Sequence, residues 1–322
     1  MAIVGTERHL VTGGAGFIGS HIARALLGRG ERVTVLDDLS TGNLRRIEGL
    51  RGDIRFIEGD VRSRDDVESA MHDAKTVIHQ AAVVSVPESV HDPMRCVSVN
   101  DVGTLQLLLA SKAKGIRRFI LAASAAAYGD TPTLPKREEM QPKPRSPYAA
   151  SKVAAEHHLQ TFAHLHGMGT ISLRYFNVYG PDQDVRSAYA SVIPKFVTQF
   201  LAGETPTIFG DGSQTRDFCF VGDVVAANLA ALECPEPKGE VVNIGTGVSC
   251  SVSALFQLLC RELRQSHIPR FHGVRDGDVL HSVADIALAS RLLGYQPRIS
   301  IEEGLKRTLS FYRQAASAGH TP

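Results

Sequence analysis

Ser124, Tyr148 and Lys152 are the residues of this chain with the clearest chemical use. Tyr148 and Lys152 are four positions apart, so on a helix they share a face, and Pro147 suits the first turn of that helix. An ammonium group beside a phenol favours the phenolate, so Tyr148 can act as a base below its usual pKa. Ser124, at the end of an apolar run, can hydrogen-bond a substrate oxygen while Tyr148 takes or returns its proton. The set predicts hydride and proton transfer at a carbinol carbon, although a serine at such a position is by itself more often structural.

Ala125 and Ala126 follow Ser124 directly, and neither side chain can donate or accept a proton. A ketone formed at the carbinol carbon therefore lacks the acid/base partner that elimination or decarboxylation would need. The predicted outcome is reversible oxidation and re-reduction.

The segment from Thr12 to Gly19 lies between an apolar run and a helical pattern, with glycines in a G-x-x-G-x-x-G spacing at Gly13, Gly16 and Gly19. Such glycines allow a tight turn, close approach of backbone N–H groups to a pyrophosphate, and close packing of helix on strand. Further along, Asp37 and Asp38 end the second apolar run, where carboxylates can bond an adenosine ribose and repel a 2′-phosphate. The pattern predicts a dinucleotide site for NAD rather than NADP. An ordinary turn at the glycines and a solvated turn after Asp37 are the alternatives.

Strand and helix patterns alternate through the first half of the chain. This alternation predicts an α/β fold with a Rossmann-like, doubly wound parallel sheet. The expected strands are 9–12, 32–36, 54–57, 75–79 and 118–123, and the expected helices are 17–29, 64–72, 94–113 and 148–166. After Arg174 the chain becomes rich in Gly, Pro and Asp loops, which with 241–244 and 251–263 predict a smaller C-terminal α/β substrate-binding lobe. We assign residues 1–176 to the NAD-binding domain, to which some later segments can return, and 177–322 to the smaller lobe.

The composition excludes several classes of protein. The chain has 322 residues, is 43% hydrophobic and carries a net charge of +1 without a block of like charge, which points away from nucleic acid and membrane partners. The longest apolar runs are too short to span a bilayer. The five cysteines form no metal-binding pattern and fit buried thiols in a reducing cytoplasm. They are Cys96, Cys219, Cys234, Cys250 and Cys260.

From about residue 9 to 312 the chain resembles an extended short-chain dehydrogenase/reductase of the UDP-glucose 4-epimerase type. The resemblance is carried by the glycine loop, by Tyr148 with Lys152, and by several separated motifs. These motifs are Gly59-Asp60-Val61, His79-Gln80-Ala81-Ala82, Asn100, Ser124-x-x-x-Tyr128-Gly129-Asp130, Leu173-Arg174-Tyr175-Phe176-Asn177-Val178-Tyr179-Gly180, Thr215-Arg216-Asp217-Phe218 and Arg275-Asp276-Gly277-Asp278.

The resemblance implies a UDP-sugar 4-epimerase with NAD as cofactor, no bound metal, and Ser124, Tyr148 and Lys152 as catalytic residues. The implied cofactor-binding residues are Gly13, Gly16, Phe17, Ile18, Gly19, Asp37, Asp38, Asp60, Val61, Gln80, Ala81, Ala82, Asn100, Tyr148, Lys152 and Tyr175. The implied substrate-binding residues are Ser85, Ser124, Ala125, Tyr148, Asn177, Arg186, Val192, Thr207, Phe209, Arg216, Arg275, Asp278 and Ser282. In this set Asn177 and Arg216 hold the diphosphate, Phe209 the uracil, and Arg275 and Asp278 the phosphate and the uridine ribose. The related dehydratases and decarboxylases carry acidic residues where Ala125 and Ala126 stand.

Two positions bear on the sugar. Ser282 occupies a place where hexose-restricted relatives have a bulky Tyr, so it permits a C2 N-acetyl group. Arg186 stands where hexosamine epimerases have Asn, and its guanidinium suits a carboxylate at C6. The hypothesis is therefore conversion of UDP-glucuronate to UDP-galacturonate, with UDP-N-acetylglucosamine and UDP-glucose as alternative substrates and a solvated loop arginine as the alternative for Arg186.

Two other functional classes and the oligomeric state stay open. An NAD-linked dehydrogenase or reductase would use the same catalytic residues but release its cofactor every turn, and a non-catalytic Rossmann sensor would need none of them. The helices expected at 94–113 and 148–166 carry enough apolar residues to pair in a homodimer or to be buried within one subunit.

Overall fold

Seven parallel strands form the central sheet, in the order β11-β6-β5-β4-β1-β2-β3. The computed structural model describes residues 7–184, 191–273 and 279–317. The strands of the sheet are β1 Arg8–Thr12, β2 Arg32–Asp37, β3 Ile54–Glu58, β4 Ala74–His79, β5 Arg118–Ser124, β6 Gly169–Tyr175 and β11 Lys238–Ile244. Strand order reverses between β1 and β4, and ligands of open α/β sheets bind beyond the carboxyl ends of the strands at this point. The predicted doubly wound α/β fold is confirmed.

Helices cover both faces of the sheet. Helices α3, α6 and α7 pack on one face, and α1, α9 and α11 pack on the other. The helices are α1 Phe17–Gly28, α2 Arg45–Glu48, α3 Arg64–Ala70, α4 Val86–His91, α5 Pro93–Val97, the π-helix η1 Ser98–Val102, α6 Gly103–Lys114, the 3-10 helix η2 Ala125–Tyr128, α7 Pro147–His166, α8 Val192–Leu201, α9 Val221–Glu233, α10 Val252–Leu263, α11 Ala287–Leu293 and α12 Ile301–Ser317. Within the described ranges, no helix combines the length and apolarity needed to cross a bilayer.

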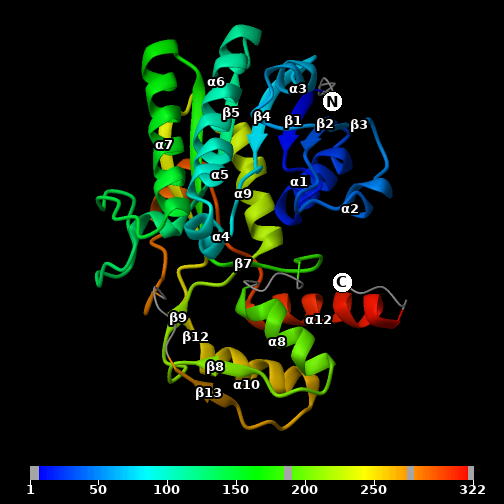
Figure 1. Ribbon diagram of the computed structural model, residues 1–322, viewed down its shortest axis with the longest axis vertical. Coiled ribbons are helices and arrows are strands. Elements are labelled where there is room, and N and C mark those ends of the chain that lie inside the picture. Colours follow the sequence, from blue (N-terminus) through cyan, green and yellow to red (C-terminus); the bar gives the residue numbers. More distant parts are fainter. Residues whose placement is uncertain (1–6, 185–190, 274–278, 318–322) are drawn as a thin grey trace.

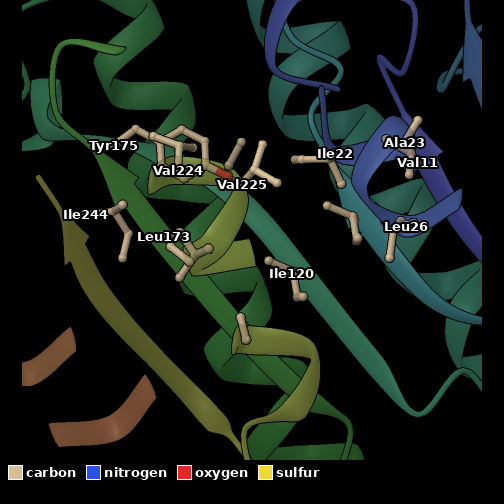
Figure 2. Close-up of a cluster of buried hydrophobic side chains, with 14 of the residues drawn as sticks. Val11, Ile22, Ala23, Leu26, Ile120, Leu173, Tyr175, Val224, Val225 and Ile244 are labelled. Carbon is tan, nitrogen blue, oxygen red and sulfur yellow. The ribbon is translucent and has the colours of Figure 1, made fainter. Parts of the chain in front are cut away.

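The apolar cluster between the sheet and helices α1 and α9 is shown in Figure 2. Val11, Ile120 and Leu173 from the strands meet Ile22 of α1 and Val224 of α9, and all five are fully buried. Burying a side chain of this size stabilises the fold by about 1.5–3 kcal/mol. The cluster fixes the two helices relative to the carboxyl ends of β1, β5 and β6.

Helix α7 begins where the sequence predicts. The Ser146 hydroxyl accepts a hydrogen bond from Ala149 N at 3.1 Å, and Pro147 occupies the first helical position, where no N–H is needed. The helix ends at Gly167, whose φ of 63° lies in the left-handed region.

The segment 94–113 is helical throughout, as expected from the sequence, and contains a π-turn. It consists of α5, the π-helix η1 and α6. Asn100 lies within η1, and its amide bonds Val83 N and Val83 O of the loop after β4, at 2.7 and 3.0 Å. These contacts join the π-helix to the loop after β4.

A smaller lobe lies beyond the carboxyl ends of the strands (Figure 1). Helices α8, α10 and α12 build its core around the fully buried Phe200, Phe256 and Leu305. Its short strands are β7 Val178–Tyr179, β8 Thr207–Phe209, β9 Thr215–Arg216, β10 Cys219–Phe220, β12 Cys250–Ser251 and β13 Arg270–His272. The segment 241–244, expected in this lobe, lies instead in β11 and pairs with β6 of the main sheet. Its short apolar run is typical of either location, so the sequence alone does not separate them.

Candidate active site

One cavity of about 890 Å³ runs along the carboxyl ends of the strands and reaches between the two lobes. Of the predicted site residues that the structure describes, all but Asn100 line it. Those residues are Gly13, Gly16, Phe17, Ile18, Gly19, Asp37, Asp38, Asp60, Val61, Gln80, Ala81, Ala82, Ser85, Ser124, Ala125, Tyr148, Lys152, Tyr175, Asn177, Val192, Thr207, Phe209, Arg216 and Ser282. Arg186, Arg275 and Asp278 lie outside the described residues.

The glycine loop has no room for side chains at two of its positions. A Cβ on Gly19 would lie 2.2 Å from Gly13 O, and a Cβ on Gly13 would lie 2.6 Å from Ala81 N. Gly13 also has a φ of +66°, a conformation that L-residues rarely adopt. The loop is therefore a close-packed turn whose backbone faces the cavity, as a pyrophosphate site requires.

The two carboxylates after β2 have different environments. Asp37 is buried, and its carboxylate accepts hydrogen bonds from Ala15 N and Leu39 N, both at 2.9 Å. Burial raises the pKa of Asp37. Asp38 is exposed and accepts hydrogen bonds from the backbone and hydroxyl of Ser40. Asp37 thus holds the glycine loop in place, in addition to its predicted ribose contact, while Asp38 leaves a carboxylate at the mouth of the cavity.

Ser124, Tyr148 and Lys152 meet at the floor of the cavity. Ser124 ends β5, and its Oγ accepts a hydrogen bond from Ala126 N at 3.2 Å. Burial raises the pKa of Tyr148, and a hydrogen bond with the Ser124 side chain acts against that rise. The serine and the phenol are therefore close enough to share one substrate oxygen.

Lys152 is placed differently from the sequence expectation. Its Nζ donates to Ala122 O at 2.8 Å, and burial lowers its pKa to about 8. Ser124, rather than Lys152, is the group that lowers the pKa of Tyr148 in this arrangement. The i, i+4 spacing places the two side chains on one face of α7, and the Lys152 ammonium bonds the backbone of β5.

Asn100 does not line the cavity but supports two elements that do. Besides holding the Val83 backbone, its Nδ2 donates to Ser151 Oγ at 3.0 Å, and Ser151 Oγ donates to Tyr148 O at 2.8 Å. The residue thereby connects the loop after β4 with the first turn of α7. Asn100, expected to bind the cofactor, therefore does not line the cavity and instead supports elements that do.

His79 is buried at the end of β4, between Thr12 of β1 and Thr104 of α6. Burial lowers its pKa to about 3, and the Lys152 charge adds to the shift. Histidine in an unfolded chain has a pKa of about 6.5. Between the folded pKa of about 3 and this value, the unfolded state binds the proton more readily than the folded state. The stability contributed by neutral His79 is present above pH 6.5 and is lost as the pH falls below it.

We expect His79 alone to lower the free energy of unfolding by about 2 kcal/mol between pH 7 and pH 5. Urea unfolding at the two pH values measures the loss. In His79→Gln, which cannot gain this proton, the difference between the two pH values should shrink by about that amount. An unchanged difference would assign the acid sensitivity to other groups, such as His9 and His21, whose pKa values burial also lowers.

The far end of the cavity is organised around the buried carboxylate of Asp217. That carboxylate accepts hydrogen bonds from Thr246 N, Gly247 N and Ala284 N at 2.8–3.1 Å. The backbone O of Asp217 accepts a hydrogen bond from Asn177 Nδ2 at 3.1 Å. Arg216 precedes Asp217 in the chain. Asp217 therefore ties together the strand ends that carry the predicted diphosphate contacts.

The remaining predicted substrate residues come from both lobes. Ser85 caps α4, Thr207 and Phe209 belong to β8, and Val192 begins α8. Ser282 is half-buried, and its N donates to Thr215 O at 3.1 Å, which places it beside the Arg216 strand. Phe209 packs against His272 with the ring centroids 5.8 Å apart.

Two buried cations that line the cavity were missed by the sequence. Arg46 is buried and donates to Ala15 O and Asp182 O, at 3.3 and 3.0 Å, so it connects the glycine loop with the loop after β7. Lys136 is buried and its ammonium bonds the Thr131 hydroxyl at 2.8 Å. Each stands in a polar, loop-like stretch, where sequence alone indicates a solvated charge.

The sequence matches a family model described as "NAD dependent epimerase/dehydratase family" over residues 9–245. The chain is similar to the UDP-glucose 4-epimerase of Mycolicibacterium smegmatis, with 38% identity over 310 residues, 95% of this chain and 98% of the relative. It is also similar to the UDP-glucuronate 4-epimerase of Thermodesulfobacterium geofontis, with 33% identity over 319 residues, 95% of this chain and 96% of the relative.

Solved structures give the same picture. The UDP-glucose 4-epimerase of Thermotoga maritima with UDP-glucose superposes with a TM-score of 0.92 at 39% identity, covering 96% of this chain and 99% of that one. The UDP-N-acetylglucosamine 4-epimerase of Methanobrevibacter ruminantium in complex with UDP-N-acetylmuramic acid superposes with a TM-score of 0.92 at 37% identity, covering 96% and 98%.

Proposed function

Because the chain belongs to the NAD-dependent epimerase/dehydratase family, we propose that it inverts C4 of a UDP-sugar through a transient 4-keto sugar, with UDP-glucuronic acid as the favoured substrate. The observation that carries the proposal is the single cavity. It brings the glycine loop, Ser124 with Tyr148, and the Asn177 and Arg216 pair into one continuous space. Such a space suits a dinucleotide and a nucleotide sugar lying end to end across the strand ends.

The residues present fit NAD, the cofactor of this family. The backbone of the glycine loop borders the cavity without side chains at Gly13, Gly16 and Gly19, and the exposed Asp38 carboxylate disfavours a 2′-phosphate. Gly13, Gly16 and Gly19 would hold the pyrophosphate, and Asp38 with Asp37 the adenosine ribose. NAD, when bound, accepts a hydride from the sugar and returns it.

Tyr148 and Ser124 carry the proton chemistry in this proposal. Ser124 hydrogen-bonds the sugar 4-oxygen, and Tyr148 takes its proton as C4 is oxidised and gives the proton back on re-reduction. The Lys152 ammonium is held by Ala122 O at the floor of the cavity, and the Ser124 side chain is the group that lowers the pKa of Tyr148. Ala125 and Ala126 line the same end of the cavity and offer no acid or base to C5 or C6, so the keto sugar turns over and is reduced on its other face.

The choice of sugar rests on Arg186 and on the relatives. A guanidinium makes paired, charge-assisted bonds to a carboxylate, so Arg186 favours a uronic acid, which one of the relatives is named for. The Mycolicibacterium relative and the Thermotoga structure carry the UDP-glucose name at higher identity, which makes UDP-glucose the second candidate. UDP-N-acetylglucosamine is the third, because Ser282 is small and the Methanobrevibacter structure is named for that sugar.

Product analysis by NMR tests the proposal. Purified enzyme without added NAD receives UDP-glucuronate, UDP-glucose and UDP-N-acetylglucosamine separately at matched concentrations. Conversion to the C4 epimer in at least one tube supports the epimerase, and fastest conversion of UDP-glucuronate supports the uronate assignment. Reduced cofactor accumulating in step with substrate would instead identify a net dehydrogenase, and no conversion of any sugar would favour a non-catalytic protein.

Arg186→Asn is expected to lower kcat/KM for UDP-glucuronate by about 10- to 100-fold relative to UDP-glucose, because hydrogen bonds to a charged group are lost. The ratio of kcat/KM for the two sugars is the measurement, since it cancels any general loss of active enzyme. A ratio equal to that of the wild type would remove the basis for the uronate assignment.

We further propose a homodimer formed through the helices beside the cavity. Val90, Met94, Val102 and Leu109 of α4, α5, η1 and α6 are each more than half exposed. Apolar side chains concentrated on neighbouring helices are typical of a protein interface.

We expect Met94→Asp with Leu109→Asp to convert the dimer to a monomer in sedimentation velocity. The matched control is Ile268→Asp, which charges an 88% exposed side chain of the smaller lobe and should leave the dimer intact. A wild-type monomer would reject the proposal.

The functional division of the chain is also proposed. NAD would be held mainly by residues 1–176 and the UDP-sugar mainly by 177–322, with α9, β11 and α11 structurally part of the first unit. Variants in the first range should then change the exchange of NAD, and variants in the second range should change the affinity for UDP.

All five cysteines lie in the described part of the chain and are free thiols, which supports a cytoplasmic location that cell fractionation can check.

A further inference from the structure

Three polar side chains form a connected group under one wall of the cavity. They are Gln80, which follows β4, Tyr175 at the end of β6, and Asn228 of α9. Gln80 and Tyr175 line the cavity, whereas Asn228 lies behind them and is fully buried. In Figure 2 the Tyr175 side chain reaches from β6 toward α9, near Val224. Neither the family motifs nor the mechanism above uses Asn228.

The orientation of the Asn228 amide is decided by a backbone carbonyl. Asn228 Nδ2 lies 2.8 Å from Val224 O, and a carbonyl oxygen can only accept a hydrogen bond. The NH2 group must therefore face Val224 O, where it also lies 2.8 Å from the Tyr175 hydroxyl. This leaves Asn228 Oδ1 as an acceptor, 3.1 Å from the Tyr175 hydroxyl and 3.4 Å from Gln80 Nε2.

The orientation of Gln80 follows from that of Asn228. Gln80 Nε2 has acceptors on the buried side, the Tyr175 hydroxyl at 3.1 Å and Asn228 Oδ1 at 3.4 Å. A flipped Gln80 amide would set two carbonyl oxygens against each other, which is unfavourable in a buried setting. Among the described residues none donates a hydrogen bond to Gln80 Oε1. This oxygen is nevertheless not buried without a partner, so it is accessible. The Gln80 carbonyl oxygen therefore belongs to the cavity.

We propose that Asn228 is a positioning residue that makes Gln80 a fixed hydrogen-bond acceptor for the bound dinucleotide. Gln80 adjoins the glycine loop, since a Cβ on Gly13 would lie 2.9 Å from Gln80 C. At this place a dinucleotide offers ribose hydroxyls or the carboxamide N–H as donors, and Gln80 Oε1 accepts from one of them. The proposal rests on NAD as the cofactor and deepens the function proposed above by assigning a role in retaining it.

The test separates positioning from simple stabilisation of the fold. Each purified holoenzyme is incubated with isotopically labelled NAD, and replacement of the bound cofactor is followed by mass spectrometry. Asn228→Leu and Gln80→Met are each expected to exchange NAD about 10-fold faster, the effect of one lost hydrogen bond. The double variant should be no faster than the faster single variant, because Asn228 acts through Gln80.

Asn243→Leu is the matched control. Asn243 is also fully buried, and its amide bonds the Tyr128 hydroxyl at 2.6 Å and Lys136 O at 2.9 Å, but it does not line the cavity. This variant should lower the melting temperature yet exchange NAD like the wild type. If Asn228→Leu does not fold, Asn228→Ala is used in the same comparison.

Two outcomes would overturn the proposal. One is wild-type exchange in the Asn228 variants, and the other is a double variant about 100-fold faster than wild type, which would mean that the two residues act independently. Failure of the proposed epimerase function would appear differently, as wild-type protein that exchanges NAD but converts none of the UDP-sugars.

Discussion

Tyr148→Phe is expected to lower kcat for epimerisation by about 10²- to 10⁴-fold while leaving the exchange of bound NAD and the affinity for UDP near wild type. The phenol lies at the Ser124 end of the cavity, where we propose that it takes and returns the proton of the sugar oxygen, and phenylalanine keeps the ring without the hydroxyl. Because the proton moves at that oxygen in both half-reactions, oxidation and re-reduction should slow together. The measurements are kcat from NMR progress curves and UDP affinity from calorimetry.

Tyr128→Phe provides the matched control for that prediction. Tyr128 is also buried, and its hydroxyl donates to Asn243 Oδ1 at 2.6 Å, but the residue does not line the cavity. The same chemical change there should alter kcat by no more than a few-fold. Comparable losses in the two variants would mean that Tyr148 supports the fold rather than the proton transfer.

Five strands of the main sheet, β1 to β5, could be predicted closely from short, largely apolar runs, whereas β6 was not predicted and β11 was expected in the smaller lobe. Strand β2 extends the expected 32–36 by one residue, and α7 begins one residue before the expected 148. The failures have tertiary causes. The segment 94–113 is helical as predicted, but its π-turn was missed, because the bond from Asn100 to the Val83 backbone is made across the fold and leaves no trace in local periodicity.

The site could be predicted where its residues stand in motifs and not where they stand alone. The glycine loop and the residues Ser124, Tyr148 and Lys152 have characteristic spacings, and the loop and Ser124 follow or end predicted strands. They could therefore be assigned to one site although they are far apart in the sequence. Arg46 and Asn228 have no such context. Arg46 follows a turn. Asn228 lies in an otherwise apolar helix, at a position where the sequence pattern suits an apolar core residue equally well. Their importance arises only when Asp182 or Tyr175 is brought to them by the fold.

A buried ion pair joins α7, the helix that carries Tyr148 and Lys152, to strand β6 of the sheet. Glu156, one turn after Lys152, accepts two hydrogen bonds from Arg174 of β6 at 2.8 and 2.7 Å, and both side chains are almost wholly buried. The Arg174 guanidinium also lies over the Tyr128 ring, 4.7 Å from its centroid. Its Nη1 has no hydrogen-bond partner among the described residues, so the charge depends on Glu156 for compensation.

Glu156→Ala is therefore expected to destabilise the protein by about 3–5 kcal/mol, because it leaves a buried guanidinium without its counter-ion. Urea unfolding measures the change. The control is Glu303→Ala, which breaks the exposed Arg307–Glu303 pair of α12, also 2.7 Å long, and should cost less than about 1 kcal/mol. Glu156→Leu combined with Arg174→Met removes both charges and should recover most of the loss, since two well-packed apolar side chains can replace a buried ion pair. If the double variant is as unstable as Glu156→Ala, the loss comes from packing rather than from an uncompensated charge. Recovered stability without recovered kcat would then show that the ion pair also sets the position of Tyr148 and Lys152 against β5.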